Sequence, residues 1–188
     1  MSLVENMKNS VVPAVKDDEN FEKALKSNAK VIFLLKSNLM TVEGYIKRAH
    51  EKGKMILLHF DLTEGLGKDD AGVKYVANIL KPDGIITTKA SVVKSATAEG
   101  LFVVFRAFLI DGQGLSSAVL NAKKLMPDAV ELMPGLLYDC VSEFLPFTNT
   151  VILGGLLRTE ESIRKALRSG ATAVSCSNPK LWEIANED

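Results

Sequence analysis

The sequence lacks any apolar run that approaches the roughly 20 residues of a membrane-spanning helix. Its first ten residues, MSLVENMKNS, lack the apolar core of a signal peptide. Cysteine is scarce, since Cys140 and Cys176 are the only two and have no metal-like spacing, which is typical of reduced thiols in a cytoplasm. We therefore expect a cytoplasmic protein with no membrane partner and no metal.

The sequence also lacks an excess of either charge, with 23 Lys and Arg residues against 23 Asp and Glu residues. A net charge of zero gives no global field to hold nucleic acid or an anionic membrane, so such a partner must be recognised by a local patch. Aromatic residues make up 6% of the chain and form no basic–aromatic stripe, and no recognised RNA-binding motif is visible. The residues by themselves do not indicate RNA binding.

Apolar residues, in contrast, make up 47% of the chain, which excludes disorder. The 188 residues are enough for one domain with a sizeable core, and no linker or low-complexity segment divides them. We therefore expect residues 1–188 to form a single domain.

Short apolar runs, flanked by glycine and polar residues, recur along the whole chain and have the length of buried parallel strands. The eight runs are SVVPAV (10–15), VIFLLKS (31–37), MILLHFD (55–61), GIITT (84–88), LFVVFRAFLI (101–110), AVELMPG (129–135), TVILGGL (150–156) and AVSCSN (173–178). Seven helical patterns lie between them, and LWEIA, at residues 181–185, is a candidate for an eighth.

The starts of these runs are spaced by roughly 23 residues, which is the repeat of a minimal (β/α)8 barrel. Eight runs in so short a chain favour a closed barrel over a doubly wound open sheet. The sequence therefore predicts an α/β fold: a single compact (β/α)8 TIM-type barrel with few insertions.

The last two strand runs end in residues that suit an anion. Gly154 and Gly155 let backbone N–H groups approach a ligand without a Cβ in the way. Ser175 and Ser177 offer hydroxyls near the start of the last helix, and Arg158 adds charge. Because the loops after strands 7 and 8 of such barrels often bind phosphate, we predict a phosphate site here. The alternative is that the two glycines only permit a tight turn.

The run that ends in HFD places His59 and Asp61 two residues apart, so a strand would turn both side chains the same way, and Glu64 follows in the loop. Three interpretations compete. The three side chains could bind a polyol through hydrogen bonds, or His59 and Asp61 could be a structural pair inside the barrel. A divalent metal site is the third and least favoured, because the spacing is not specific.

Arg106 interrupts an otherwise apolar strand run, and a buried charge there needs a partner. Glu131, on the next run, is one candidate and Asp61 is another. We favour a structural ion pair over direct contact with a ligand, although an arginine held by carboxylates can still meet a ligand.

No catalytic constellation is visible. The sequence has no nucleophile elbow and no defensible Ser–His–Asp order. It has two histidines, and His59 with Asp61 is the best acid–base pair that it offers. We predict no catalytic residue and no cofactor, and a site that holds a small phosphorylated polyol rather than one that transforms it.

Four stretches carry a resemblance to a known family, and together they are specific. They are HFDLTEGLGKDDAGVKYVANILKPDGIITTK (59–89), FRAFLIDGQGL (105–115), PDAVELMPG (127–135) and LGGLLRTEESIRKALRSGATAVSCSNPKLW (153–182). The chain resembles the glycerol uptake operon antiterminator regulatory proteins over nearly its entire length. This resemblance implies a small barrel-type regulator that senses glycerol 3-phosphate and binds leader mRNA of glycerol-utilisation genes, so that transcription passes a terminator.

The resemblance also implies roles for individual residues. The phosphate would be held by Gly154, Gly155, Ser175 and Ser177. The glycerol moiety would be surrounded or supported by His59, Asp61, Arg106 and Glu131.

Other functions stay open at this point. If RNA binds, we expect a local patch near the ligand rim that includes Lys68, Lys89 and Arg158. The alternative to a regulator is a barrel enzyme of the isomerase, aldolase or glycerol-phosphate transferase type that acts on a small phosphorylated metabolite. A metabolite-binding protein that has lost RNA binding is a third class, and a homo-oligomer is compatible with the sequence.

Overall fold

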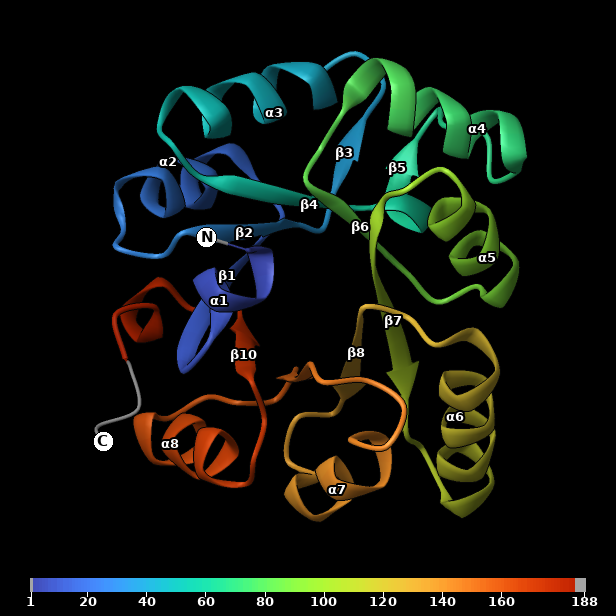
Figure 1. Ribbon diagram of the computed structural model, residues 1–188. Coiled ribbons are helices and arrows are strands. Elements are labelled where there is room, and N and C mark those ends of the chain that lie inside the picture. Colours follow the sequence, from blue (N-terminus) through green and yellow to red (C-terminus); the bar gives the residue numbers. More distant parts are fainter. Residues whose placement is uncertain (1, 185–188) are drawn as a thin grey trace.

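Eight parallel strands close into a barrel in the computed structural model, which describes residues 2–184 (Figure 1). Their order around the barrel is β1-β10-β9-β8-β7-β6-β4-β2, and β10 closes the ring against β1. The strands are β1 (Ser10–Val15), β2 (Val31–Leu34), β4 (Met55–His59), β6 (Gly84–Thr87), β7 (Phe102–Phe108), β8 (Ala129–Met133), β9 (Val151–Gly154) and β10 (Ala173–Cys176). The predicted barrel is confirmed, and the open sheet is excluded.

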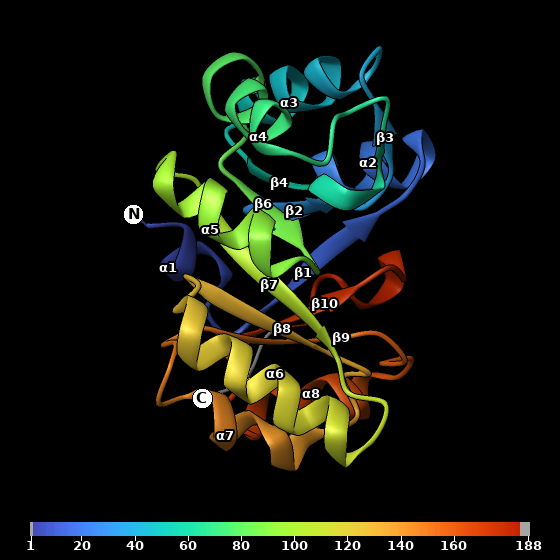
Figure 2. The same cartoon turned by 90° about the vertical axis from the view of Figure 1, so that its right-hand side faces the viewer.

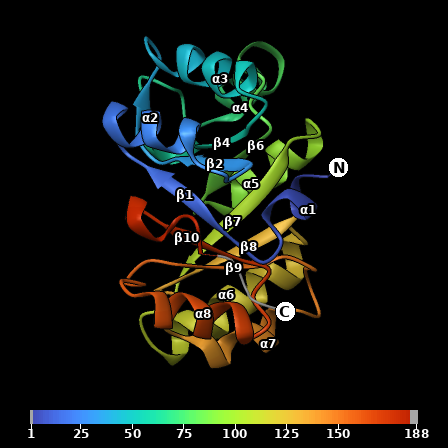
Figure 3. The same cartoon turned by 90° about the vertical axis from the view of Figure 1, so that its left-hand side faces the viewer.

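Seven helices follow the first seven strands and surround the barrel of residues 2–184, as the helical patterns predicted (Figures 1 and 3). They are α2 (Asp18–Lys26), α3 (Val42–Glu51), α4 (Asp70–Tyr75, continued by a π-helical turn at Val76–Leu80), α5 (Ala90–Ala98), α6 (Gly112–Leu125), α7 (Val141–Phe144, after a 3-10 turn at Tyr138–Cys140) and α8 (Glu160–Arg168). Asp69 and Thr159 cap α4 and α8, because their side chains accept backbone N–H groups of the first turn.

The prediction of an eighth helix at LWEIA (181–185) is wrong for residues 181–184, and Ala185 lies outside the described residues. A 3-10 turn at Pro179–Leu181 follows β10 instead. The Trp182 indole N–H donates to the Cys176 carbonyl at 2.8 Å, and Leu181 and Trp182 are buried. This bond turns the chain back onto the end of β10 before a helix can extend.

Short elements lie at both ends of the barrel. Helix α1 (Leu3–Met7) precedes β1 and buries Met7 in the barrel interior. At the opposite end from α1 (Figure 2), β3 (Ser37–Asn38) pairs in parallel with β5 (Thr63–Glu64) (Figure 1). The run predicted as one strand over 31–37 is therefore split, since β2 ends at Leu34 and Ser37 already belongs to the small sheet at the rim.

The barrel interior is apolar through most of its depth. The residues that fill it are Met7, Val12, Ala14, Val31, Phe33, Leu35, Leu57, Ile86, Val104, Ala129, Ile152 and Ala173. Residues of the opposite strand face pack against the surrounding helices in a second, larger cluster. Successive strand residues alternate between these two faces. A side chain that stands two residues along a strand from one of the interior residues therefore also points into the barrel.

Two helical glycines with opposite surroundings give a test of this packing. Each is the third residue of its helix, in α3 and in α4. A Cβ added at Gly44 would meet nothing within 4 Å, whereas one added at Gly72 would overlap the backbone carbonyl of Gly67. We expect Gly44→Ala to stabilise the protein by about 0.5–1 kcal/mol. We expect Gly72→Ala to destabilise it by about 1 kcal/mol or more.

Urea unfolding midpoints of the wild type and the two variants measure both effects. A Gly72→Ala variant as stable as the wild type would contradict the expectation, because it would require the 67–72 segment to shift at no cost.

Candidate functional site

A polar layer lies on top of the apolar interior, at the carboxyl end of the strands. Each of its members stands two residues beyond an interior apolar residue of the same strand, and so also points into the barrel. The members are His59 on β4, Arg106 on β7, Glu131 on β8 and Ser175 on β10, and Gly154 takes the equivalent position on β9 without a side chain. The sequence-predicted residues thus converge from five strands.

Glu131 is the centre of this layer. One of its oxygens, Oε2, accepts from Arg106 Nε at 2.6 Å, and the other, Oε1, accepts from the Ser175 hydroxyl at 2.6 Å. The Arg106 and Glu131 side chains are 6% and 0% exposed. The buried ion pair predicted for Arg106 is confirmed, with Glu131 rather than Asp61 as its partner.

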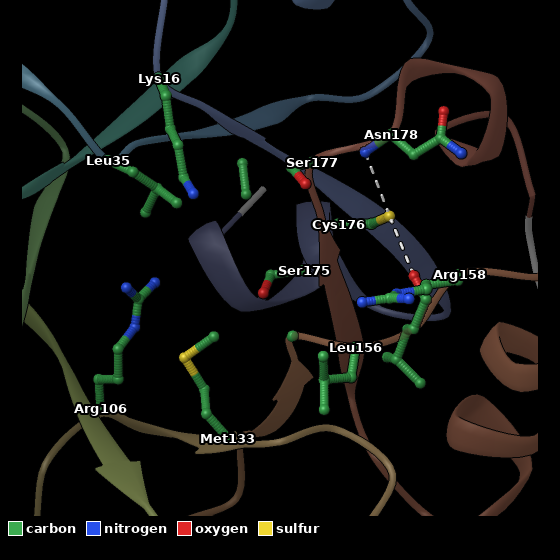
Figure 4. Close-up of a pocket in the computed structure, with 13 residues that line it drawn as sticks. Lys16, Leu35, Arg106, Met133, Leu156, Arg158, Ser175, Cys176, Ser177 and Asn178 are labelled. Carbon is green, nitrogen blue, oxygen red and sulfur yellow. Dashed lines mark hydrogen bonds between the residues drawn. The ribbon is translucent and has the colours of Figure 1, made fainter.

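Arg106 also reaches the cavity above the layer. Its Nε is bound to Glu131, and its terminal N–H groups make no hydrogen bond with the residues that the structure describes. Figure 4 shows the guanidinium beside the cavity, across from Lys16 and near Met133. Because the carboxylate holds the guanidinium from one side, the free N–H groups are presented to a ligand in a fixed direction.

His59 and Asp61 do not form the structural pair that was one of the three interpretations. Asp61 lies in a 3-10 turn, Phe60–Leu62, that directly follows β4, so the strand alternation no longer applies to it. Its carboxylate instead accepts from the Thr87 hydroxyl at 3.0 Å and from the Thr88 backbone N–H at 2.7 Å. No hydrogen bond joins the His59 and Asp61 side chains within residues 2–184, and Asp61 fastens the end of β4 to the end of β6.

His59 is a neutral residue of the interior. It is 3% exposed, and its Nδ1 is buried with no hydrogen-bond partner among residues 2–184. Burial, and then the nearby charge of Arg106, lower the pKa of His59 to about 4. His59, Asp61 and Glu64 also do not gather into a group that could hold a metal in the part of the chain that the structure describes.

The first cavity, which we call the β9–β10 pocket, lies above the polar layer and has a volume of about 490 Å³ (Figure 4). Its lining comprises Ala14, Lys16, Leu35, Arg106, Met133, Gly155, Leu156, Leu157, Arg158, Ser175, Cys176, Ser177 and Asn178. Four of the five residues predicted for a phosphate line it, and Ser177 and Arg158 are exposed to it. The structure thus brings the ends of β9 and β10 together around one cavity.

The two glycines after β9 have different roles. Gly155 lines the pocket and has a φ of +77°, a conformation that favours glycine. Gly154 lies behind the pocket, because a Cβ there would overlap the Ser175 hydroxyl and the Glu131 carboxylate. Gly154 therefore makes room for the ion pair, and Gly155 shapes the loop that faces the pocket.

A second cavity, which we call the β4–β7 pocket, adjoins the first and has a volume of about 610 Å³. Its lining comprises Lys16, Leu35, Lys36, Asp61, Leu62, Thr63, Glu64, Gly65, Lys68, Arg106, Phe108 and Met133. Lys16, Leu35, Arg106 and Met133 line both pockets. The two pockets are therefore halves of one hollow at the carboxyl end of the barrel.

The three residues predicted for an RNA patch occupy different places. Arg158 lines the β9–β10 pocket, Lys68 lines the β4–β7 pocket, and Lys89 is exposed at the start of α5 and lines neither. The Lys68 ammonium donates to the carbonyls of Phe60 and Thr63, at 2.7 and 2.5 Å, and burial lowers the pKa of Lys68. Lys68 thus fastens its own loop as well as facing the cavity.

Sequence reasoning missed Lys16, which lines both pockets. It follows the strand run 10–15 and stands two residues after the inward-facing Ala14, so the strand alternation could have found it. Phe108 and Met133 were missed in the same way, since each stands two residues beyond a polar-layer residue on its strand.

The hollow has an excess of positive charge. Lys16, Lys36, Lys68, Arg106 and Arg158 line the two pockets, against the carboxylates of Asp61 and Glu64. Glu131 lies just below and is already paired with Arg106. The fold and this site define a (β/α)8 barrel with a cavity, lined mainly by positive charge, at the carboxyl end of its strands.

Comparison with known proteins gives the family. The chain belongs to the glycerol-3-phosphate responsive antiterminator family, which matches residues 11–182. The glycerol uptake operon antiterminator regulatory protein of Listeria monocytogenes is 32% identical, with a TM-score of 0.87 over 93% of this chain and 95% of that one. An antiterminator-related protein of Thermotoga maritima is 29% identical, with a TM-score of 0.85 over 95% and 100% of the two chains. Escherichia coli YgcP is 32% identical over 95% of this chain and 94% of its own length.

The family confirms the resemblance noted in the sequence and makes the chain a regulatory protein rather than an enzyme. Aldolase barrels that are 11–13% identical share its fold alone. No helix within residues 2–184 has the length and apolar character needed to cross a membrane.

Proposed function

We propose that this barrel senses glycerol 3-phosphate in the hollow at its carboxyl end and, when loaded, binds leader mRNA of glycerol-utilisation genes so that transcription passes a terminator. The observation that carries the ligand site is Arg106, whose guanidinium is fixed by Glu131 and has N–H groups free toward the cavity. The family, which responds to this ester, supports the choice of ligand.

The phosphate belongs in the β9–β10 pocket. β9 and β10 are the seventh and eighth strands of the barrel, whose loops bind phosphate in many barrels of this type. The turn at Gly155 lines the cavity with backbone that carries no Cβ, which suits an anion, and Ser177 offers a hydroxyl. Lys16 and Arg158 supply charge from opposite sides.

The glycerol hydroxyls then face Arg106, whose remaining N–H groups donate to them. Glu131 holds that guanidinium from below and is itself held by the Ser175 hydroxyl, and Asp61 holds the neighbouring rim together. In this arrangement His59 stays neutral in the layer beneath the ligand and is a supporting residue.

RNA binding follows from a local patch, since the chain has no net charge. Arg158 and Lys68 line the hollow, and Lys89 is exposed beyond it. A ligand that contacts these rim loops raises RNA affinity, and by linkage RNA raises the affinity for the ligand by the same factor.

Calorimetric titration tests the ligand site. We expect the wild type to bind glycerol 3-phosphate more tightly than glycerol or inorganic phosphate. We expect Arg158→Gln to weaken binding of the ester about tenfold, because one charged hydrogen bond to the phosphate is lost. Arg168→Gln, which removes an exposed arginine from the last turn of α8, is the matched control and should bind as the wild type does.

Failure of the ester to bind would contradict the proposal at its centre. Where the ester binds, the same protein is titrated with the leader transcript of the source organism's glycerol-utilisation genes, with and without the ester. Equal RNA affinity in both titrations would contradict the coupling.

A further inference from the structure

The hollow is larger than the proposed effector needs. Pockets that enclose a drug-sized ligand measure about 300–1,000 Å³, and the two pockets here, at about 490 and 610 Å³, each reach that range alone. Glycerol 3-phosphate is much smaller than such a ligand. If the ester occupies the β9–β10 pocket, as proposed above, the β4–β7 pocket is left for a second group, and the inference below depends on that proposal.

The lining of the β4–β7 pocket also does not suit the effector. Leu35, Leu62, Phe108 and Met133 form its apolar walls. Glycerol 3-phosphate has a hydroxyl or phosphate on every carbon and gains little from such walls. Leu62 and Phe108 are 51% and 54% exposed. Two large apolar side chains at the mouth of the pocket are therefore accessible to solvent and do not form part of the core.

Positive charge surrounds these apolar walls. Lys16 and Lys36 are exposed at the edge of the pocket, and neither forms an ion pair with a residue in the described range 2–184. Asp61 and Glu64 add hydrogen-bond acceptors on the β4 side. A ligand that fits this pocket has a flat apolar face for the apolar walls, polar edges for the two carboxylates and a negative charge beside it for the two lysines.

We propose that the β4–β7 pocket receives one unstacked base of a single-stranded segment of the leader RNA. The base stacks on Phe108, and Lys16 and Lys36 contact the phosphates on either side of it. RNA recognition in single strands relies on this kind of splayed base on an aromatic ring, together with cations that follow the backbone. The chemistry differs from that of a purely electrostatic lysine patch, because one aromatic contact carries much of the affinity.

The position of the pocket explains how the effector acts on RNA. Lys16, Leu35, Arg106 and Met133 form the wall between the two pockets and touch both. Glu131 already fixes Arg106, and a ligand in the β9–β10 pocket fixes the exposed Lys16 beside it, so the base then meets an ordered wall on the other side. The ester and the RNA are neighbours in one hollow and need no distant conformational change.

Fluorescence anisotropy with a fluorescein-labelled leader transcript, at saturating glycerol 3-phosphate, tests this site. We expect Phe108→Ala to weaken RNA binding roughly 5- to 150-fold, the range for one lost base–aromatic stack. Phe108→Trp, which keeps a stacking ring, should restore binding to within a few fold of the wild type. Tyr75→Ala removes an exposed aromatic side chain from α4, outside both pockets, and should have no effect.

The outcomes separate this inference from the function on which it rests. Wild-type binding of RNA with an unchanged affinity in Phe108→Ala would overturn the base site and leave the proposed function standing. A loss of glycerol 3-phosphate affinity in Phe108→Ala, equal to the loss of RNA affinity, would assign the pocket to the effector and also overturn it. Dimerisation of the wild type that Phe108→Ala abolishes, with RNA binding unchanged, would assign the pocket to a second copy of the chain. If the wild type binds no RNA, both the function and the base site fail.

Discussion

Replacing Glu131 with alanine is expected to lower the free energy of unfolding by about 3–5 kcal/mol, the largest loss that we expect from a single substitution in the site. The variant leaves the Arg106 guanidinium buried with no opposite charge, because its one ion-pair partner within residues 2–184 is gone. The Ser175 hydroxyl loses its acceptor at the same time. Each of these groups is almost fully shielded from water, so solvent cannot replace the carboxylate.

Thermal and urea unfolding measure this loss. For a chain of this length, about 3–5 kcal/mol corresponds to a fall in melting temperature of roughly 6–20 °C. A loss below about 1 kcal/mol would contradict the expectation, since it would mean that the guanidinium finds water or another partner in the variant.

A double variant separates stability from ligand binding. Arg106→Met with Glu131→Leu replaces the buried pair with apolar side chains of similar size, an exchange that is often neutral or stabilising in other proteins. We expect it to regain most of the stability that Glu131→Ala loses and to bind no glycerol 3-phosphate. A double variant as unstable as Glu131→Ala would attribute the loss to altered packing rather than to the unpaired charge.

The barrel itself could be predicted from the sequence because buried parallel strands leave a strong pattern. All eight apolar runs became barrel strands. The run 10–15 has the same bounds as β1, and each of the other seven extends one to three residues beyond the C-terminal end of its strand. The Arg106–Glu131 pair could be predicted as well, since a charge inside an apolar strand needs a partner and the next strand offered one. The prediction of the strands and the prediction of the ion pair both depend only on interactions between neighbouring residues or neighbouring strands.

The errors arose where a local rule was extended beyond its element. Asp61 was assigned the direction of His59 by strand alternation, but β4 ends at His59 and a 3-10 turn begins with the next residue. The helix expected at LWEIA failed for a similar reason, because the Trp182 indole N–H donates to the Cys176 carbonyl at the end of β10. In both places the apolar pattern gives no sign of where the regular element ends.

The different structural roles of Gly154 and Gly155 could not be predicted from the sequence. Gly154 and Gly155 are equivalent as a sequence motif. Gly154 is required because Glu131 and Ser175, which come from two other strands, meet directly in front of it. The exclusion of a side chain there is a property of the assembled barrel, and so are the volumes of the two pockets.

Acidification is expected to remove stability through His59, which gives the second large effect. Its pKa is about 4 in the folded protein, below the ordinary value of 6.5, because burial and the charge of Arg106 disfavour the imidazolium. Between these two values the unfolded chain binds a proton that the folded protein does not. The stability due to neutral His59 is therefore fully present above about pH 6.5 and is lost as the pH falls toward 4, by about 3 kcal/mol in total.

The comparison of His59→Gln with the wild type isolates this effect, because both proteins share every carboxylate that also titrates in acid. The stability difference between them, from urea unfolding at several pH values, should shift by about 3 kcal/mol between pH 7 and pH 4. Ile86→Val is the matched control: it removes one methyl group from the residue paired with His59 on β6, costs about 0.5–1.5 kcal/mol and should do so equally at every pH. A constant difference between His59→Gln and the wild type over this range would mean that the buried imidazole accepts a proton without penalty. In that case a fixed water or the Glu131 carboxylate must stabilise the cation, and His59 would join Arg106 as a second positive charge beneath the ligand.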